Sequence, residues 1–317
     1  HPAGAVKTWS AQQGIHDMSE TFKGVAAMVL ACVIWGLSPL FYKALAHVPP
    51  LEVLSHRTLW SFVLFIGLML IQKRMGEFLR LFTSARVVVL ILIAALLIST
   101  NWGLFIWSIQ VGRAVESSLG YYIFPLVAVL LGAVIFRERL SAVQWFCVGL
   151  AAVAVITLTI GLRVVPLVSL ALAITFGFYG VLKKRLEAGP VISVAAEVTV
   201  LLPLALIWLY GVHALGWQGP VGRNLGIFGA DQTDTLLLIL SGAVTAVPLI
   251  LFSYASRRAP LSIVGLVQYL NPTLQGAIAI FVFQEAFTIW HMIAFALIWS
   301  ALALFSFDTL RKGTKTG

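Results

Sequence analysis

The sequence is poor in charged residues and in cysteine, and it lacks familiar catalytic and nucleotide-binding motifs. Charged residues make up 10% of the 317 residues, against roughly a quarter in an ordinary soluble domain. The two cysteines, Cys32 and Cys147, both fall within apolar stretches, which predicts no disulfide. No H-E-x-x-H, G-x-S-x-G or nucleotide-binding loop is present. These absences argue against hydrolytic enzymes and ATP-driven pumps, and we expect neither a cofactor nor a metal site.

Apolar residues, by contrast, are abundant and lie in long runs. Hydrophobic residues make up 60% of the chain and the mean hydropathy is +0.99. A helix needs about 20 mostly apolar residues to cross a bilayer. The sequence predicts an all-α integral membrane protein with ten transmembrane helices, at residues 22–45, 51–72, 86–111, 114–136, 141–160, 163–183, 190–210, 235–255, 260–283 and 288–307.

The net charge of +9 is distributed unevenly over the loops that these helices leave. If the N-terminus is inside, 16 of the 21 basic residues fall on that side and only Lys43, Arg113, Arg163 and Arg223 on the other, with Arg57 inside a helix. Basic residues concentrate in cytoplasmic loops. The pattern therefore predicts a multi-pass membrane protein with both termini in the cytoplasm. It does not predict a nucleic-acid partner, because no basic stripe lies in a soluble segment.

The two halves of the chain are related to each other. At an offset of 147 residues, Tyr122-Ile-Phe-Pro125 aligns with Tyr269-Leu-Asn-Pro272, and at an offset of 141, Trp35-Gly36 aligns with Phe176-Gly177. Each half contains five predicted helices, an odd number, so the second half must be inverted relative to the first. Inverted repeats are typical of secondary transporters, in which two similar halves rock around a central site.

This repeat predicts the domain organisation. Residues 22–161 would form the first five-helix repeat and residues 162–310 the second, inverted one. Residues 1–21 would form an N-terminal arm, either disordered or left over from expression, and residues 311–317 a cytoplasmic tail. The longest connection, residues 211–234, would lie on the outer side.

Several prolines fall within the predicted helices. Pro39, Pro125, Pro203, Pro248 and Pro272 each remove a backbone hydrogen bond and bend their helix. Pro125 and Pro272 are about 17 Å into their helices at 1.5 Å per residue, close to the bilayer midplane. We predict that Pro39, Pro125, Pro248 and Pro272 are hinges, although a purely structural kink would have the same sequence pattern.

Several further runs of residues resemble the RarD group of the EamA family, in the drug/metabolite transporter superfamily. The resemblance covers residues 22 to about 310. It implies ten helices in two inverted repeats in a bacterial inner membrane, and export or exchange of small molecules. The runs are Ser55-His56-Arg57-x-x-Trp60-Ser61, Gly120-Tyr121-Tyr122-Ile-x-Pro125-Leu126, Thr245-Ala-Val-Pro248-Leu249, Gln268-Tyr269-x-x-Pro272-Thr273-Leu274-Gln275 and Phe283-x-Glu285-x-Phe287.

Polar residues inside the membrane are the candidates for a substrate site. An arginine within the bilayer costs at least about 2.5–3.5 kcal/mol, so it must face protein or water. Arg57, Asn101 and the adjacent Tyr121 and Tyr122 lie at similar depth in three helices, in the outer half of the membrane. Arg57 would bind an anionic or carbonyl group, and Asn101 and a tyrosine would form hydrogen bonds. A structural network between the helices explains the same residues, and sequence alone leaves both interpretations open.

A matching inner layer follows from the inverted repeat. Glu197 is pseudo-equivalent to Arg57, and Gln268 and Tyr269 lie at similar depth. Glu197 is the carboxylate deepest in any predicted span and is our candidate for proton coupling, although a structural glutamate would have the same pattern. Trp35 and Trp102 would line an amphipathic pocket together with these residues.

The function predicted from these features is secondary transport, not catalysis. We expect export of a small organic metabolite or drug-like solute by alternating access. An intramembrane enzyme or a membrane scaffold subunit are the alternatives, but a scaffold would not need arginine, asparagine and glutamate within the membrane. The identity of the substrate, the coupling ion and a possible homodimer stay open.

Overall fold

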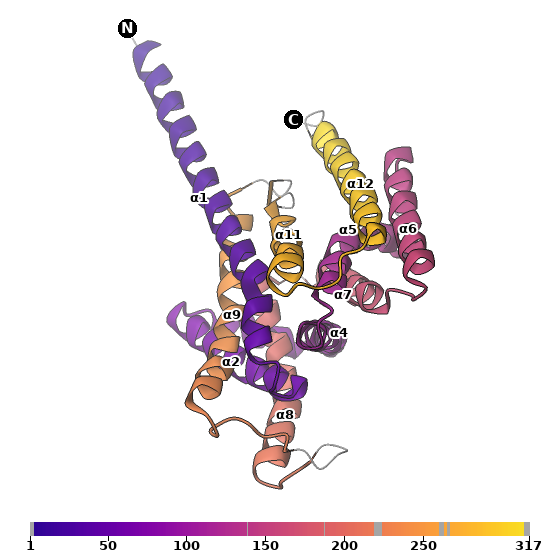
Figure 1. Ribbon diagram of the computed structural model, residues 1–317. Coiled ribbons are helices and arrows are strands. Elements are labelled where there is room, and N and C mark those ends of the chain that lie inside the picture. The colour runs from indigo at the N-terminus through magenta and orange to yellow at the C-terminus, as the bar shows by residue number, and fades with distance from the viewer. Residues whose placement is uncertain are drawn as a thin grey trace.

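The computed structural model describes residues 3–137, 139–186, 188–218, 224–259, 263–264 and 267–313, and within them the chain is built from helices. Extended residues pair there only at two isolated bridges, both in the connection between α8 and α9. The helices, labelled in Figure 1, are α1 (Ala3–Ala44), α2 (Pro50–Ile71), α3 (Met75–Arg80), α4 (Ala85–Gln110), α5 (Ala114–Phe136), α6 (Ala142–Leu162), α7 (Leu167–Arg185), α8 (Pro190–His213), α9 (Gln232–Ser256), α11 (Leu270–Ala277), which continues as a π-helical turn over Ile278–Val282, and α12 (Ile289–Gly313).

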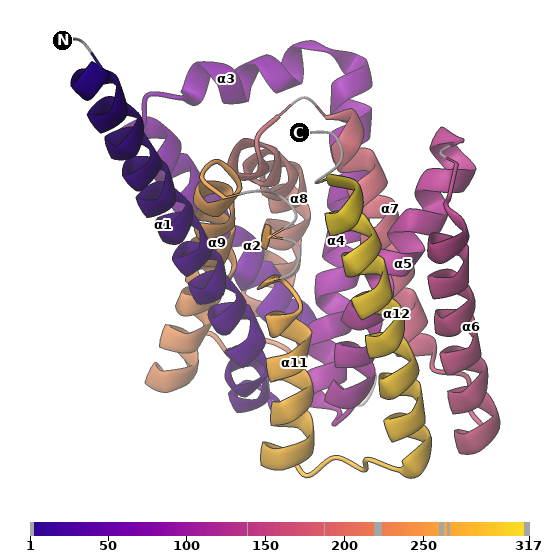
Figure 2. The ribbon, with the colours of Figure 1, turned by 90° about the horizontal axis from the view of Figure 1, so that it is seen from above.

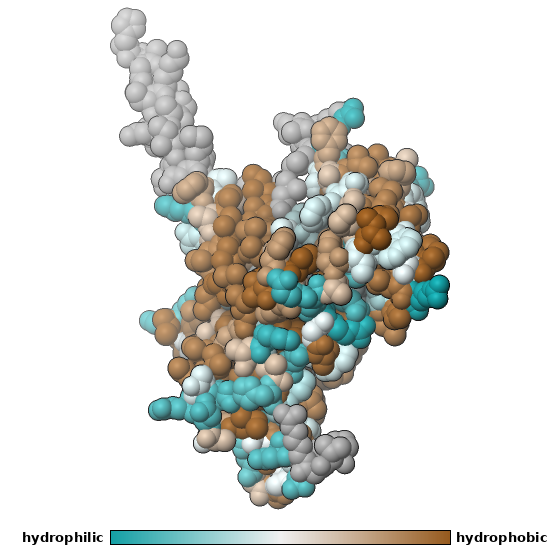
Figure 3. Space-filling model, viewed as in Figure 1, coloured by the Kyte–Doolittle hydropathy of each residue, from teal (hydrophilic) through white to brown (hydrophobic). Residues whose placement is uncertain are grey.

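Eight of the described helices are long and apolar enough to cross a membrane. Two shorter apolar helices, Leu167–Lys183 and Leu270–Val282, lie where the sequence predicts the sixth and ninth spans. Large apolar side chains also point outward, and Phe146, Ile156 and Leu204 are each more than half exposed. Figure 3 shows hydrophobic residues over much of the face in view. Helices that are apolar all round are stable in lipid rather than in water. The predicted all-α membrane protein is therefore confirmed.

The helices pack as two groups that meet at the centre of the bundle (Figures 1 and 2). In one group α1, α2, α8 and α9 pack on one another, and in the other α7 packs on α4 and α5, with α6 paired to α12. Helix α11 lies between the groups, against both α1 and α5. Helix α1 begins and α12 ends at the same end of the bundle, where the short α3 also lies (Figure 2).

Glycines allow some of these helices to approach each other closely. A Cβ atom on Gly242 of α9 would lie 2.5 Å from the backbone carbon of Trp60 in α2. A Cβ atom on Gly120 of α5 would lie 2.7 Å from the carbonyl oxygen of Ser169 in α7. Small residues at such crossings allow the close backbone packing that drives helix association in lipid.

The helix ends and breaks differ in part from the predicted spans. Pro39, Pro125 and Pro248 lie inside α1, α5 and α9. The ninth predicted span is interrupted, because Gln268 and Tyr269 form a turn before α11 begins, which places Pro272 in the first turn of α11. Residues 260–262 and 265–266 of that span lie outside the described residues.

The N-terminal segment and the connection between α8 and α9 also have defined backbone structure. Helix α1 begins at Ala3, so most of the predicted N-terminal arm is helical and continuous with the first span. In the connection before α9, the Asp231 carboxylate accepts hydrogen bonds from the backbone N–H groups of Asp234 and Thr233. These bonds, with that of Asp234 the strongest influence, lower the pKa of Asp231. Residues 219–223 of this connection, including Arg223, lie outside the described residues, as do Glu138, Glu187 and residues 314–317.

Candidate functional site

A central cavity of about 690 Å³ lies where the two groups of helices meet. Side chains from α1, α2, α4, α5, α7, α8, α9, α11 and α12 line it. Its walls are rich in aromatic side chains, which are Trp35, Tyr42, Trp102, Phe105, Tyr121, Phe124, Phe176, Tyr179, Phe252, Tyr269 and Phe305. A cavity with apolar walls and a few polar groups is the usual form of a small-molecule site.

Arg57 enters this cavity from α2. The centre of its guanidinium lies 4.1 Å from the centre of the Trp102 ring, and its Nη1 donates a hydrogen bond to Tyr42 Oη at 3.0 Å. The residue is 6% exposed, and its Nε has no hydrogen-bond partner. No described carboxylate forms an ion pair with it. Because a desolvated cation without a counter-charge is unfavourable, an anionic or carbonyl group of a solute would be stabilised here.

Asn101 and Tyr121 lie on the cavity wall close to Arg57. Asn101 Nδ2 donates hydrogen bonds to Leu172 O at 3.0 Å and to Thr175 Oγ1 at 2.9 Å, both in α7. Its Oδ1 accepts a hydrogen bond from Tyr121 Oη at 3.0 Å. Asn101 is fully buried, so it joins α4 to α7 and orients the Tyr121 ring. The sequence left two interpretations open, a substrate site and a structural network between helices. The structure has features of both, because Asn101 connects two helices and Tyr121 lines the cavity.

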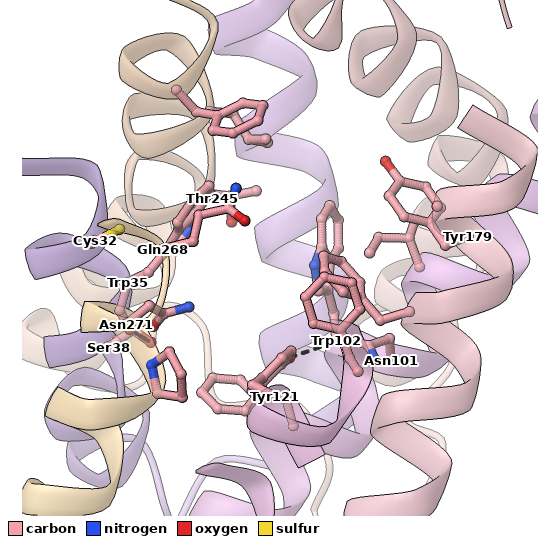
Figure 4. A pocket seen from close by; sticks show the side chains of 18 of the residues that line it. Cys32, Trp35, Ser38, Asn101, Trp102, Tyr121, Tyr179, Thr245, Gln268 and Asn271 are labelled. Atoms are coloured by element: carbon pink, nitrogen blue, oxygen red, sulfur yellow. Dashed lines mark hydrogen bonds between the residues drawn. The ribbon is translucent and has the colours of Figure 1, made fainter. Parts of the chain in front are cut away.

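Amide side chains occupy the opposite wall, on and near α11. Figure 4 shows Gln268 and Asn271 with Trp35 on one side of the cavity and Trp102, Asn101 and Tyr179 on the other. Behind them, Gln275 Nε2 donates a hydrogen bond to Asn271 Oδ1 at 2.8 Å, and Gln275 Oε1 is buried without a partner. The wall thus offers both hydrogen-bond donors and acceptors to a solute.

A second polar cluster lies between α7 and α8. Lys183 Nζ is 2.6 Å from Glu197 Oε1 and also contacts Ser193 Oγ. Tyr179 Oη donates a hydrogen bond to Glu197 Oε2 at 2.8 Å. Glu197 itself is fully buried behind the cavity wall, whereas Lys183, Ser193 and Tyr179 line the cavity. Glu197 is therefore ion-paired with a group that the cavity reaches.

The other predicted residues divide between the cavity and the protein interior. Pro125, Pro272 and Tyr269 line the cavity. Tyr122 does not, because its ring packs on Phe295 and Trp299 of α12 and its hydroxyl contacts Thr273. The hinge candidates Pro39 and Pro248 are buried within α1 and α9 and do not line it either. His56, which the sequence places on another face from Arg57, stacks on Phe228 outside the cavity.

Sequence reasoning missed Tyr42, Lys183, Asn271 and Gln275 as members of this site. Lys183 was counted only among the loop charges, although it pairs with Glu197. The repeat contained a usable signal, because the offset of 141 residues pairs Tyr42 with Lys183. These are the side chains that contact Arg57 and Glu197 respectively.

The two ends of the cavity differ. Toward the end of the bundle that carries α3, the lining includes Ala188 of the α7–α8 connection, Pro190 at the start of α8 and Ser306 of α12. At the opposite end, hydrogen bonds join the connections. Gln110 Nε2 donates to Leu45 O and Val48 O at 2.9 and 3.1 Å. The Glu285 carboxylate accepts from the backbone N–H groups of Ala114 and Val115, both at 2.8 Å.

Comparisons with known proteins give a consistent assignment. The family model described as the EamA-like transporter family matches residues 22–160. An uncharacterized transporter of Vibrio cholerae is 40% identical over 94% of this chain and 96% of its own length, and a protein RarD of Streptomyces exfoliatus is 39% identical over 89% and 88%. A solved crystal structure of a protein, 20% identical, superposes with a TM-score of 0.56 over 90% of this chain and 96% of that one, which supports the fold alone.

Proposed function

Because this chain belongs to the EamA-like transporter family, we propose that it is a secondary transporter that exports a small organic metabolite or drug-like solute across the bacterial inner membrane. The observation that carries this proposal is the central aromatic cavity, with the buried cation of Arg57 on its wall. The relatives named as transporters support a role other than catalysis. A membrane scaffold would have no use for a cavity of this kind.

Two inverted five-helix repeats are part of the proposal, and the cavity lining supports them. Many lining residues of the first half correspond, at the two offsets found in the sequence, to lining residues of the second half. The pairs are Trp35 with Phe176, Ser38 with Tyr179 and Tyr42 with Lys183 at 141 residues, and Ile98 with Thr245, Trp102 with Leu249, Phe105 with Phe252, Tyr121 with Gln268, Phe124 with Asn271 and Pro125 with Pro272 at 147 residues.

Helix packing supports the same pseudo-twofold relation. Exchange of the two halves converts the α1–α9 contact into α7–α4, the α1–α11 contact into α7–α5, and the α2–α9 contact into α8–α4, and all six pairs occur. The pairs α2–α8, α5–α11 and α6–α12 are each converted into themselves, and these also occur. Ten spans are required for this relation, with Leu167–Lys183 and Leu270–Val282 as the two short ones.

The difference between the ends of the cavity supports alternating access as the mechanism. The cavity extends toward the end that carries α3, while hydrogen bonds join the connections at the other end. If the α3 end is cytoplasmic, as the basic residues predict, this conformation faces inward. Exchange of the two repeats' conformations would give the outward-facing state. The interrupted ninth span and the unbroken α5 are equivalent segments in different conformations, as this mechanism requires.

The topology can be tested with introduced cysteines, because both natural cysteines are buried. Asn224→Cys lies in the α8–α9 connection and Ser84→Cys just before α4, and both positions are exposed. An impermeant maleimide added to intact spheroplasts is expected to label Asn224→Cys and to spare Ser84→Cys until the membrane is permeabilised. Labelling in the reverse order would place the termini outside.

The export of a solute can be tested before the solute is identified. Spent medium from cells that overexpress the protein is compared by untargeted metabolomics with medium from cells that lack it. We expect one or a few small organic solutes to be enriched in the medium and depleted inside the overexpressing cells. Enrichment inside the cells instead would reverse the direction, and identical profiles under many growth conditions would contradict export.

A further inference from the structure

Three side chains with metal-binding atoms meet outside the cavity, at the end of the bundle opposite α3. Glu52 and His56 lie one turn apart in α2, and His213 is the last residue of α8. Glu52 Oε1 is 3.0 Å from His213 Nε2 and 3.9 Å from His56 Nε2. One atom from each residue can be chosen so that all three lie within 4.8 Å of one another. No such group could be recognised in the sequence, because His213 is far from the other two residues along the chain.

His56 provides the second observation. The residue is 3% exposed, and neither of its ring nitrogens has a hydrogen-bond partner. Its ring is fixed by stacking on Phe228, with the ring centres 4.4 Å apart. Buried polar atoms are nearly always satisfied, and an ion or a water molecule bound between this imidazole, the Glu52 carboxylate and the second imidazole would satisfy the His56 nitrogens.

Hydrogen bonds from backbone N–H groups hold the Glu52 carboxylate in place next to the two histidines. It is fully buried, and its Oε1 accepts hydrogen bonds from the backbone N–H groups of Ile227 and Phe228 at 2.8 and 2.9 Å. Hydrogen bonds of this kind orient metal-binding carboxylates. Oε2 accepts a bond only from Ile227 N–H among the described residues, which leaves it with lone pairs for a cation.

His213 gives access from outside. Its side chain is 33% exposed, and the ring packs against Gly226, where a Cβ atom would lie 2.9 Å from it. A hydrated ion can therefore reach the cluster from solution at this end of the bundle, whereas His56 and Glu52 form the closed inner side.

We propose that Glu52, His56 and His213 bind a divalent transition-metal ion, with Zn²⁺ as the preferred one. Two imidazoles and one carboxylate are a common zinc ligand set, with water as the fourth ligand. Calcium and magnesium prefer oxygen ligands and fit this set poorly. Ligand atoms around tetrahedral zinc are about 3.3 Å apart, for bonds of about 2.0–2.1 Å. Glu52 Oε1 is 3.0 Å from His213 Nε2 and 3.9 Å from His56 Nε2, and the three ligand atoms lie within 4.8 Å of one another. Rotation of the side chains would bring these atoms, or Glu52 Oε2 in place of Oε1, to the spacing around the ion.

The ion would act as a clamp. It would tie α2 to the end of α8 and, through Glu52, to the connection at Ile227 and Phe228. Bound zinc is therefore expected to stabilise the closed outer end and so to hold the protein in the conformation described here. That consequence rests on the proposed function, whereas the binding site itself does not.

Zinc binding can be measured on the full-length protein in detergent after chelator treatment and removal of any affinity tag. We expect one tight Zn²⁺ per chain by isothermal titration, weakened at least about 100-fold in His213→Ala and in His56→Ala. His47→Ala is the matched control, because this histidine lies at the same end of the bundle and pairs with Asp234 rather than with the cluster; its affinity should equal that of the wild type. Size-exclusion profiles identify any variant that fails to fold, and the half-exposed position of His213 makes that variant the safer one.

The clamp has a separate readout. Zinc is expected to slow amide hydrogen exchange at Ile227 and Phe228 in the wild type and in His47→Ala, and to leave exchange unchanged in His213→Ala. Absence of zinc binding by the wild type would overturn the site. Binding by His213→Ala and His56→Ala as tight as that of the wild type would also overturn it. Binding without protection of these two amides would overturn the clamp. Neither result bears on whether the protein exports a solute, which the comparison of media measures independently.

Discussion

An Arg57→Met variant is expected to bind and export the solute about 10- to 100-fold less well than the wild type while staying folded in the membrane. A hydrogen bond to a charged group contributes about 1.5–3 kcal/mol, which corresponds to that range of affinity. Arg57 has no described counter-charge, one hydrogen bond to Tyr42 and a stacking contact with Trp102. The solute is the partner that would complete this environment.

Stability is expected to change in the opposite direction from activity. Methionine keeps much of the length and apolar surface of the arginine but removes the buried charge. Replacement of a buried charged group by an apolar one of similar size is often neutral or stabilising. The melting temperature of Arg57→Met in detergent should therefore equal or exceed that of the wild type.

Two further variants separate charge from shape. Arg57→Lys keeps the charge but loses the planar group that stacks on Trp102, and intermediate export is expected. Arg86→Ala removes an exposed arginine at the start of α4 and should leave export unchanged. Loss of folded Arg57→Met protein would assign Arg57 to the structural network between helices, and full export by that variant would remove Arg57 from the site.

The membrane character of the fold could be predicted because it depends on local properties of the sequence. Runs of apolar residues such as 86–111 and 235–255 predict helices, because every backbone polar group of a segment in lipid must be satisfied within that helix. The prediction was weakest where backbone structure depends on neighbours. The sequence pattern of the ninth predicted span is continuous, yet Gln268 and Tyr269 form a turn beside the cavity.

The site was only partly predictable, because it depends on which side chains meet. The number of residues from each helix end places Arg57, Asn101 and Tyr121 at a similar depth in the membrane. In the structure, Asn101 and Tyr121 are joined by a hydrogen bond. The same arithmetic could not tell Tyr121 from Tyr122, since adjacent helical residues point about 100° apart. Tyr121 faces the cavity and Tyr122 packs on α12.

Partners from other helices were the hardest to predict. Glu197 was considered alone, and its pairing with Lys183 depends on how α7 packs on α8. Glu52 is as deeply buried as Glu197, but its place in the first turn of α2 gave the sequence no sign of this burial. Its burial results from the α8–α9 connection, which folds over it.

A Glu197→Gln variant is expected to lose the response of transport to a pH gradient. In the proposed function, a gradient of an ion or a solute supplies the energy for transport. A proton carrier needs a titratable group that the two sides of the membrane reach in turn. Glu197 is buried, but its partner Lys183 lines the cavity in the present conformation. A proton could therefore reach the pair from the cavity in one state and be released from it in the other.

The ion pair requires a second variant as a control. Glu197→Gln leaves Lys183 without its counter-charge, and a broken buried pair costs about 3–5 kcal/mol in stability. The Lys183→Met, Glu197→Gln double variant removes both charges and should recover most of that loss, with the Tyr179 hydroxyl able to bond to the glutamine. Glu77→Gln, at an exposed position of α3, controls for removal of a carboxylate elsewhere. Both Glu197 variants should still exchange solute across the membrane.

The measurement is uptake into proteoliposomes of a solute identified from the comparison of media, with and without an imposed pH gradient. If the gradient drives Glu197→Gln and the double variant as strongly as the wild type, the pair with Lys183 only holds α7 to α8. If the gradient has no effect on the wild type, the protein is a facilitator or solute exchanger, and Glu197 needs no titration for transport. Proton coupling through Glu197 requires one pattern alone: a gradient response in the wild type and in Glu77→Gln that both Glu197 variants lack, with solute exchange retained.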